Sequence, residues 1–230
     1  MATRADVWFI DMDKTAILPY SSSIPTSWDM MNQVAGLGKV GQRLWEKYHP
    51  HPEQYEEWVQ ELASYYYGRE AKPIQDEVIA ATTIRSGLTE MIHYVKVQNP
   101  RAQQGIISAG LEFVAGYVAG QVGLDFYKGI ELKVGDDGKF TGDAVIHVRE
   151  TDKVTAAKQY LHGTPWKKAA HIGDGRSDIS LWKQVGHAFG IGVGEEYRSH
   201  VAHNFEGFRD LQQHLQQTGN PTLKRKREMF

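Results

Sequence analysis

The chain has 230 residues, of which 41% are hydrophobic and 23% are charged, and its formal net charge is −2. This is ordinary globular composition, and the length fits one large domain or a core with a smaller insert. The small net charge gives no reason to expect nucleic acid as a partner. Because the sequence contains no cysteine, disulfides, thiolate zinc sites and a cysteine nucleophile are excluded.

The N-terminal residues do not resemble a secretory signal, because their apolar run is interrupted at Asp11. No stretch approaches the roughly 18 apolar residues that a membrane span requires. We therefore expect a cytoplasmic protein without a membrane partner.

The first predicted element is a short buried strand at residues 7–10, where apolar and aromatic residues follow one another without interruption. Two carboxylates, Asp11 and Asp13, come directly after it. Ligands of open α/β sheets bind beyond the carboxyl ends of parallel strands, so Asp11 is predicted to lie at such an edge. Taken alone, the pair fits an acidic turn equally well.

Residues 17–83 are predicted to form a small helical segment. A loop leads to a helix that begins at Trp28 and that Thr26 or Ser27 could cap. This helix is the first of three or four short helices, with breaks at residues 49–52 and 71–73. The segment is rich in aromatic side chains, and Tyr55 and Trp58 belong to a stripe at helical spacing. Packing is the favoured role of this stripe, although some rings are expected to lie over the end of the first strand.

Beyond Pro73 strands and helices alternate. Strands are predicted at residues 104–108, 130–134, 140–148, 169–172 and 188–193, and helices at residues 76–83, 87–97, 111–122, 152–161, 177–185 and 208–216. This order predicts an α/β fold, a Rossmann-like, doubly wound parallel sheet with an inserted α-helical cap. The core is assigned to residues 1–16 and 84–223, the cap to residues 17–83 and a basic tail to residues 224–230.

Three further groups of polar residues stand where later strands are predicted to end. Ser108 and Ala109 lie at a turn whose backbone amides can hold an anion. Lys153 occupies the first turn of a predicted helix, an unfavourable place for a cation on dipole grounds, which indicates that it serves a partner. Asp174 and Asp178 lie in a glycine turn. Each group alone fits an ordinary cap, surface or turn role, but their joint occurrence indicates one site.

The acidic residues of this set require a counter-charge. Two carboxylates about 4 Å apart repel each other by about 4 kcal/mol at an effective dielectric near 20. Asp11, Asp13, Asp174 and Asp178 would meet in one pocket with Lys153, so either some are protonated or a cation lies among them. Oxygen ligands supplemented by water suit Mg²⁺.

The ordered set resembles the motifs of the haloacid dehalogenase-like hydrolases, which are D-x-D-x-T, a Ser or Thr, a Lys and G-D-x(3)-D. The matching positions are residues 11–15, Ser108, Lys153 and residues 173–178. The resemblance covers the whole core and is greatest to the phosphoserine phosphatase-like branch, which also carries a helical cap between its first and second motifs.

The resemblance implies phosphoryl transfer. Asp11 would be the nucleophile that forms an aspartyl-phosphate. Asp13 would protonate the leaving oxygen and then act as base for the attacking water. Thr15, placed with the phosphate-binding residues, would hold Asp13 in position.

The same resemblance assigns the remaining residues. Ser108, Ala109 and Lys153 would bind the phosphoryl oxygens and offset the developing charge. Mg²⁺ would be held by the acidic residues Asp11, Asp13 through its backbone carbonyl, and Asp174, with Asp178 supporting the metal's water shell or the lysine.

These assignments predict a Mg²⁺-dependent phosphomonoesterase that acts on a small phosphorylated metabolite. One alternative is a phosphotransferase that passes the phosphoryl group to an alcohol. The other is a binding module that has lost turnover, but such a module should lack one of the motif residues, and all of them are present.

Two departures disfavour phosphoserine as the substrate. Tyr20 stands where phosphoserine phosphatases carry a glutamate, and the comparable cap helix contains no arginine. Arg43 and Arg69 are candidates to replace that arginine. An aromatic, mildly acidic cap is also compatible with an apolar or cationic group, such as a choline-like head.

Overall fold

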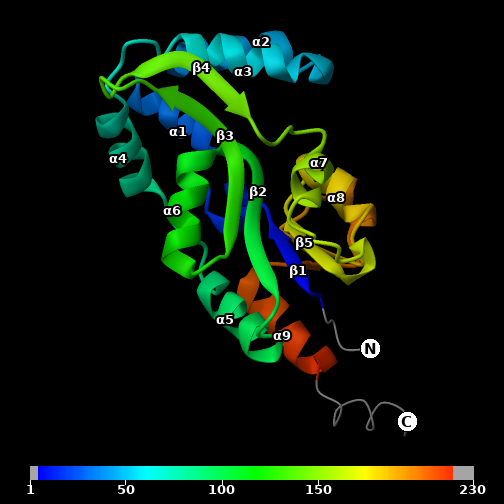
Figure 1. The fold of residues 1–230 in the computed structure, drawn as a ribbon. Helices are drawn as coiled ribbons and strands as arrows, with labels where there is room; N and C mark the ends of the chain where they lie inside the picture. The colour runs from blue at the N-terminus through cyan, green and yellow to red at the C-terminus, as the bar shows by residue number, and fades with distance from the viewer. Residues whose placement is uncertain (1–4, 220–230) are drawn as a thin grey trace, which may run out of the picture.

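The structure is a computed structural model that describes residues 5–219. One seven-stranded sheet runs in the order β4-β3-β2-β1-β5-β6-β7 (Figure 1). Its strands are β1 (Val7–Ile10), β2 (Gln103–Leu111), β3 (Phe126–Val134), β4 (Phe140–Ile146), β5 (Ala169–Gly173), β6 (His187–Ile191) and β7 (His203–Phe205). All neighbouring strands are parallel except β3 and β4. The predicted α/β fold with a doubly wound sheet is confirmed.

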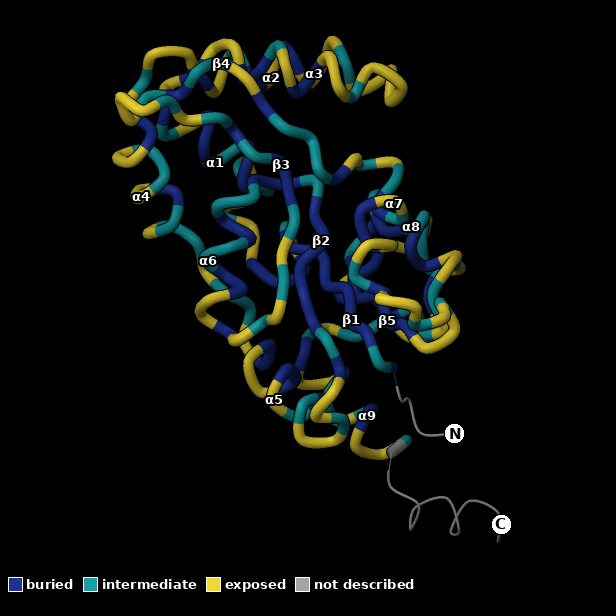
Figure 2. Tube along the Cα trace, viewed as in Figure 1, coloured by how far each residue is buried: buried dark blue, intermediate teal, exposed yellow. Residues whose placement is uncertain are grey.

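Helices cover both faces of the sheet, as the alternating side chains of β1 require. Trp8 and Ile10 belong to the apolar core on one face, whereas Val7 and Phe9 belong to the core on the other. The first face is covered by α5 (Leu88–Gln98), α6 (Glu112–Val122) and α9 (Phe208–Gly219), and the second by α7 (Lys153–Lys158) and α8 (Ile179–Trp182). Figure 2 shows that the central strands between these layers are buried.

Four helices lie between β1 and α5 in the chain. They are α1 (Ser27–Val34), α2 (Gly38–Tyr48), α3 (Tyr55–Ser64) and α4 (Ala71–Ala81), and they agree with the predicted helical segment. Helix α4 begins before Pro73, which had been interpreted as a break. Proline is tolerated there because the N–H groups of a first helical turn have no partner within the helix.

The hairpin of β3 and β4 joins this helical segment to the sheet. The side-chain amide of Gln60 on α3 donates to the carbonyl of Ala144 on β4 at 2.9 Å, and the Gly68 N–H donates to the Phe140 carbonyl at 2.9 Å. The buried ring of Phe140 packs edge-on against Tyr66, with 5.7 Å between the ring centroids. The segment therefore rests on the edge of the sheet that β4 forms (Figure 1).

The ends of several strands and helices differ from those predicted from the sequence. Strand β2 continues to Leu111, beyond the predicted end at Ser108, because pairing with β3 resumes at Leu111 after an irregularity. Strand β7 was not predicted, since three residues are too few to show alternation. The predicted helix at residues 177–185 is replaced by a 3-10 turn, Arg176–Asp178, and the short α8.

The predicted basic tail, residues 224–230, lies outside the described residues. Among the helices of residues 5–219, none has the length and apolar character needed to cross a membrane.

We expect Phe140→Ala to lower the free energy of unfolding by about 3–5 kcal/mol, because it removes a buried ring that joins the helical segment to the sheet. Val134→Ala is the control, since Val134 pairs with Phe140 in the hairpin but is 43% exposed. Its effect should stay within about 0.5 kcal/mol. Urea unfolding measures both, and equal losses would contradict this anchoring role.

Candidate active site

The candidate site lies where the central strands end. Because β1 lies between β2 and β5 in the sheet, the segments that follow these strands meet at one edge. Asp11 and Asp13 follow β1, Ser108 lies near the end of β2, and Asp174 follows β5. The fold therefore brings together groups that are up to 163 residues apart in the chain (Asp174 minus Asp11).

Lys153 joins two of the acidic residues. Its side chain is fully buried, and its Nζ atom lies 2.5 Å from Oδ1 of Asp11 and 2.7 Å from Oδ1 of Asp178. Burial alone would lower the pKa of Lys153, but the negative charges of Asp11 and Asp178 outweigh it and raise this pKa above its ordinary value. The lysine therefore stays charged at neutral pH and fixes the orientation of Asp11.

Asp178 is saturated with hydrogen bonds. Its Oδ1 atom contacts Lys153 and lies 2.8 Å from Nε2 of His171, and its Oδ2 atom accepts the N–H groups of Asp174 at 3.0 Å and Gly175 at 3.1 Å. Burial opposes ionisation, but the charge of Lys153 and the hydrogen bond from His171 hold the pKa of Asp178 well below its usual range. All of these contacts position the neighbours of Asp178. His171, which holds this carboxylate in turn, was not predicted from the sequence.

Asp13 is held by the first residue of α1. Its Oδ1 atom accepts the Ser27 N–H at 2.7 Å, and its Oδ2 atom accepts the Ser27 hydroxyl at 2.9 Å. Burial and the nearby charge of Asp11 raise the pKa of Asp13 to about 7 despite these bonds. A carboxyl group with this pKa is partly protonated at neutral pH and can supply a proton.

The contact expected between Thr15 and Asp13 is not the one that the structure shows. The Thr15 hydroxyl faces Oδ1 of Asp174 at 3.5 Å, whereas Ser27 holds Asp13. The sequence indicated Ser27 only as a possible helix cap, because nothing in its local pattern shows that α1 begins against the end of β1.

The turn after β1 is fixed by a distant arginine. Lys14 has a backbone φ of 60°, in the left-handed region that most residues avoid. The guanidinium of Arg85 donates to the carbonyl of Lys14 at 2.5 Å and to that of Thr15 at 2.9 Å. Arg85 therefore holds the conformation that presents Asp11 and Asp13, and its position 70 residues later gave no sequence signal.

Asp174 carries negative charge that its neighbours only partly balance. Its Oδ2 atom lies 2.8 Å from Nζ of Lys14. Burial, followed by the charges of Asp11 and Asp178, nevertheless raises the pKa of Asp174 to about 6. Together with the raised pKa of Asp13, this indicates a site with more negative charge than the protein itself neutralises.

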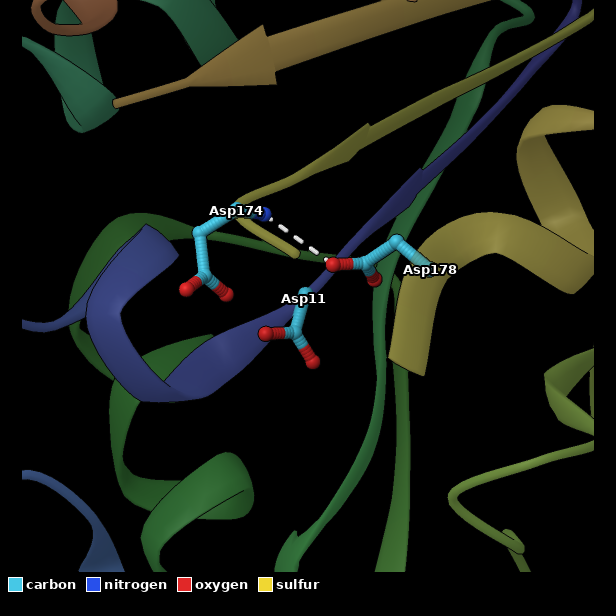
Figure 3. Close-up of side chains that lie close together, drawn as sticks. All are labelled: Asp11, Asp174 and Asp178. Carbon is cyan, nitrogen blue, oxygen red and sulfur yellow. Dashed lines mark hydrogen bonds between the residues drawn. The ribbon is translucent and has the colours of Figure 1, made fainter. Parts of the chain in front are cut away.

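The acidic cluster fits a divalent cation. Carboxylate oxygens of Asp11, Asp174 and Asp178 lie within 4.8 Å of one another (Figure 3). An all-oxygen donor set of this kind suits Mg²⁺. Both oxygens of Asp178 already accept hydrogen bonds or contact Lys153 within the protein. The carboxylates with oxygen lone pairs left to coordinate a metal are therefore those of Asp11 and Asp174.

The irregular end of β2 packs directly against Asp13. A Cβ atom on Gly110 would lie 2.5 Å from Oδ2 of Asp13, so only glycine fits there. The Ser108 hydroxyl oxygen accepts the Gly110 N–H at 3.2 Å. The Ala109 carbonyl accepts the indole N–H of Trp28 at 3.3 Å and the hydroxyl of Tyr55 at 3.2 Å. These bonds tie the helical segment to the predicted phosphate-binding turn.

A cavity of about 420 Å³ opens over these groups, a size that suits a small metabolite. Its polar end is lined by Asp11, Asp13, Lys14, Ser108, Ala109 and Asp174. Its other end is formed by side chains of α1, α2 and α3. Thr15, Lys153 and Asp178 are not among the lining residues, so these three act on the site from behind its surface.

A comparison with protein families shows to which family this site and fold belong. The family model of the haloacid dehalogenase-like hydrolases matches residues 9–183, which include Asp11, Ser108, Lys153 and Asp178. The chain belongs to the haloacid dehalogenase-like hydrolases. The predicted family is confirmed.

Within this family, the similar proteins include phosphoserine phosphatases, in agreement with the predicted branch. The phosphoserine phosphatase of Saccharomyces cerevisiae is 24% identical over 188 residues, which are 80% of this chain and 58% of that protein. The chain therefore spans little more than half the length of this curated relative. A substrate-bound phosphoserine phosphatase complex has a TM-score of 0.74 at 18% identity and covers 91% of this chain and 98% of its own. The phosphoserine phosphatase from T. onnurineus has a TM-score of 0.68 at 14% identity, over 93% and 96% of the two chains.

We expect Lys153→Met to lower the free energy of unfolding by about 3–5 kcal/mol when no divalent cation is added, because it leaves two buried carboxylates without their cation. Lys14→Met is the matched control, since the Lys14 side chain is 47% exposed and its pair with Asp174 should contribute less than about 1 kcal/mol.

Urea unfolding of both variants measures the difference. Adding Asp11→Asn to Lys153→Met should restore part of the lost stability, because one of the unpaired charges is then gone. Equal losses in the two lysine variants, or no recovery in the double variant, would contradict the role given to Lys153.

Proposed function

We propose that the chain is a Mg²⁺-dependent phosphomonoesterase that works through an aspartyl-phosphate. The observation that supports this most strongly is the placement of Asp11. One of its oxygens is held by Lys153, and its carboxyl group lines the cavity beside Asp13. A nucleophile and a partly protonated acid thus face the same space, as a two-step phosphoryl transfer requires.

In the proposed first step, the free Oδ2 atom of Asp11 attacks phosphorus and the bond from phosphorus to the substrate oxygen breaks. Asp13 gives its proton to that leaving oxygen, so the product departs as an alcohol. In the second step, Asp13 takes a proton from water, which attacks the phosphorus of the acyl phosphate. Inorganic phosphate leaves and the carboxylate of Asp11 is restored.

The phosphoryl group would be bound by the turn after β2. We assign its oxygens to the hydroxyl of Ser108 and the backbone amide of Ala109, with Lys153 offsetting charge through Asp11. Thr15 would act indirectly, through its contact with Asp174. The conformation of the turn, fixed by Gly110, supports this arrangement.

Mg²⁺ would be held by Asp11, Asp174 and the backbone carbonyl of Asp13, with Asp178 in support. When bound, it neutralises negative charge on the phosphoryl group and the carboxylates. The raised pKa values of Asp13 and Asp174 support a need for such a cation.

We further propose that residues 17–83 act as a cap on a core formed by residues 1–16 and 84–223. The helices of this segment form one end of the cavity, so their movement would admit substrate and then exclude water. Substrate choice would then depend on the side chains of this segment.

Release of p-nitrophenol and phosphate from p-nitrophenyl phosphate, with Mg²⁺ and with a chelator, tests the proposed activity. We expect turnover that needs Mg²⁺ and is lost in Asp11→Asn, because the amide is a poor nucleophile. Equal rates in the wild-type and variant chains would support a binding module instead. If an added alcohol captures phosphate so that p-nitrophenol exceeds phosphate, the chain is a phosphotransferase.

For Asp13→Asn we expect kcat/KM, which depends on the first step, to fall by about 10²–10⁴-fold with an alkyl phosphate and by less with p-nitrophenyl phosphate. The reason is that nitrophenolate is a stable anion and leaves without a proton. An alkoxide is a poor leaving group and must be protonated as it leaves. The Mg²⁺ concentration for half-maximal activity should stay unchanged, because the metal contact of Asp13 is a backbone atom. An equal loss with both substrates would argue against Asp13 as the acid.

A further inference from the structure

The far end of the cavity is built from aromatic rings. Trp28, Trp45, Tyr55 and Trp58 all line it. Trp58 lies at the centre, and its ring centroid is 5.5 Å from those of Trp28 and Tyr55 and 6.3 Å from that of Trp45. The ring planes of Trp28, Tyr55 and Trp45 are inclined to that of Trp58 by 64°, 38° and 75°, so the rings do not form a flat stack.

These rings are fixed close to the phosphate-binding turn. Trp28 and Tyr55 both donate to the carbonyl of Ala109, the residue after Ser108. Their polar atoms are thereby used, which leaves ring faces as the surface offered to a ligand. A small phosphomonoester bound at Asp11 would reach this aromatic end without a long linker.

Packing alone does not account for the group. Trp45 is 47% exposed although it lines the cavity, so its indole is not there to fill the interior. The indole N–H of Trp58 is buried and has no acceptor within residues 5–219. A buried donor without a partner is costly, and an oxygen atom of a bound ligand would supply one.

The charged groups at this end are two acidic residues and Arg176, whose Nε atom lies 4.0 Å from Glu150. Asp29 and Glu150 line the cavity beside the rings. The two candidate arginines of the cap face elsewhere, since Arg43 donates to a tyrosine hydroxyl and Arg69 donates to backbone carbonyls, and neither lines the cavity. The helical segment therefore offers no arginine to a carboxylate on the substrate.

The basic groups that do line the cavity come from elsewhere in the chain and face carboxylates. Lys14 pairs with Asp174, and Nε of Arg176 lies 4.0 Å from Glu150. Tyr20, which stands where phosphoserine phosphatases carry a glutamate, contacts the hydroxyl of Thr82 and does not line the cavity. A second anionic group on the substrate would therefore have to compete with Asp174 for Lys14 or with Glu150 for Arg176.

We propose that the aromatic end binds a methylated ammonium group, so that the substrates are phosphomonoesters of quaternary amino alcohols. This inference rests on the proposed phosphomonoesterase function. A cation over several ring faces is attracted by their quadrupoles, and aromatic cages that exclude water bind quaternary ammonium groups in this way. A methylated ammonium needs no hydrogen-bond acceptor, which suits Trp28 and Tyr55, whose polar atoms are already engaged by the Ala109 carbonyl.

The test compares phosphocholine with 3,3-dimethylbutyl phosphate, which has the same shape without the positive charge. We expect kcat/KM to be about tenfold higher for phosphocholine, because the matched pair isolates the cation–π contribution. Trp45→Leu should reduce this ratio several-fold, and Glu150→Gln should reduce it by a smaller factor. Tyr67→Leu is the control, since Tyr67 is an exposed aromatic of the same segment that does not line the cavity, and it should leave the ratio unchanged.

A ratio near one in a chain that hydrolyses p-nitrophenyl phosphate would overturn this inference and leave the proposed function standing. Faster turnover of phosphoserine than of phosphocholine would also overturn it. If no ester is hydrolysed, the proposed function fails. Calorimetry with choline and 3,3-dimethylbutanol then still tests whether the aromatic end is a cage for a methylated ammonium group. Tighter binding of choline, weakened by Trp45→Leu, would support the cage, and equal binding would overturn it.

Discussion

The buried charge of Lys153 is the interaction on which the site depends. Its ammonium group lies between Asp11 and Asp178 with no access to solvent. Burial raises the pKa of Asp11, the charge of Lys153 lowers it, and the charge of Asp178 raises it further. The net pKa of Asp11 stays above its ordinary value, and without the lysine it would rise further. With the lysine in place, Asp178 is a fixed acceptor and Asp11 keeps one oxygen in a defined direction. The same bonds therefore supply both stability and the orientation of the proposed nucleophile.

The rest of the site is arranged around this pair by the ends of three neighbouring strands. Ser27 holds Asp13 from the helical segment, and Gly110 on β2 leaves room for the Asp13 side chain. Arg85 fixes the strained turn between Asp11 and α1. The hydrogen bonds to the Ala109 carbonyl then set the aromatic end at a fixed distance from the phosphate-binding turn. The proposed chemistry and the proposed substrate choice would thus depend on different elements that share one small turn.

The sequence predicted those residues of the site that stand next to the end of a predicted strand or helix. Asp11, Ser108, Lys153 and Asp174 each stand beside a strand or helix end, so their convergence followed from the order of elements in a parallel sheet. Contacts between distant segments had no such pattern. Ser27 looked like a helix cap, and Arg85 and His171 carried no signal, because their partners are reached only through the tertiary fold. The extension of β2 past Ser108 likewise depends on pairing with β3.

The most direct measurement identifies the residue that carries the phosphoryl group. The chain would be quenched with acid during turnover and reduced with borohydride, which converts an acyl phosphate of aspartate to homoserine. The account predicts homoserine at position 11 alone, with substrate and Mg²⁺ both required. Turnover without any modification at Asp11, or modification at Asp13 or Asp174 in its place, would contradict it.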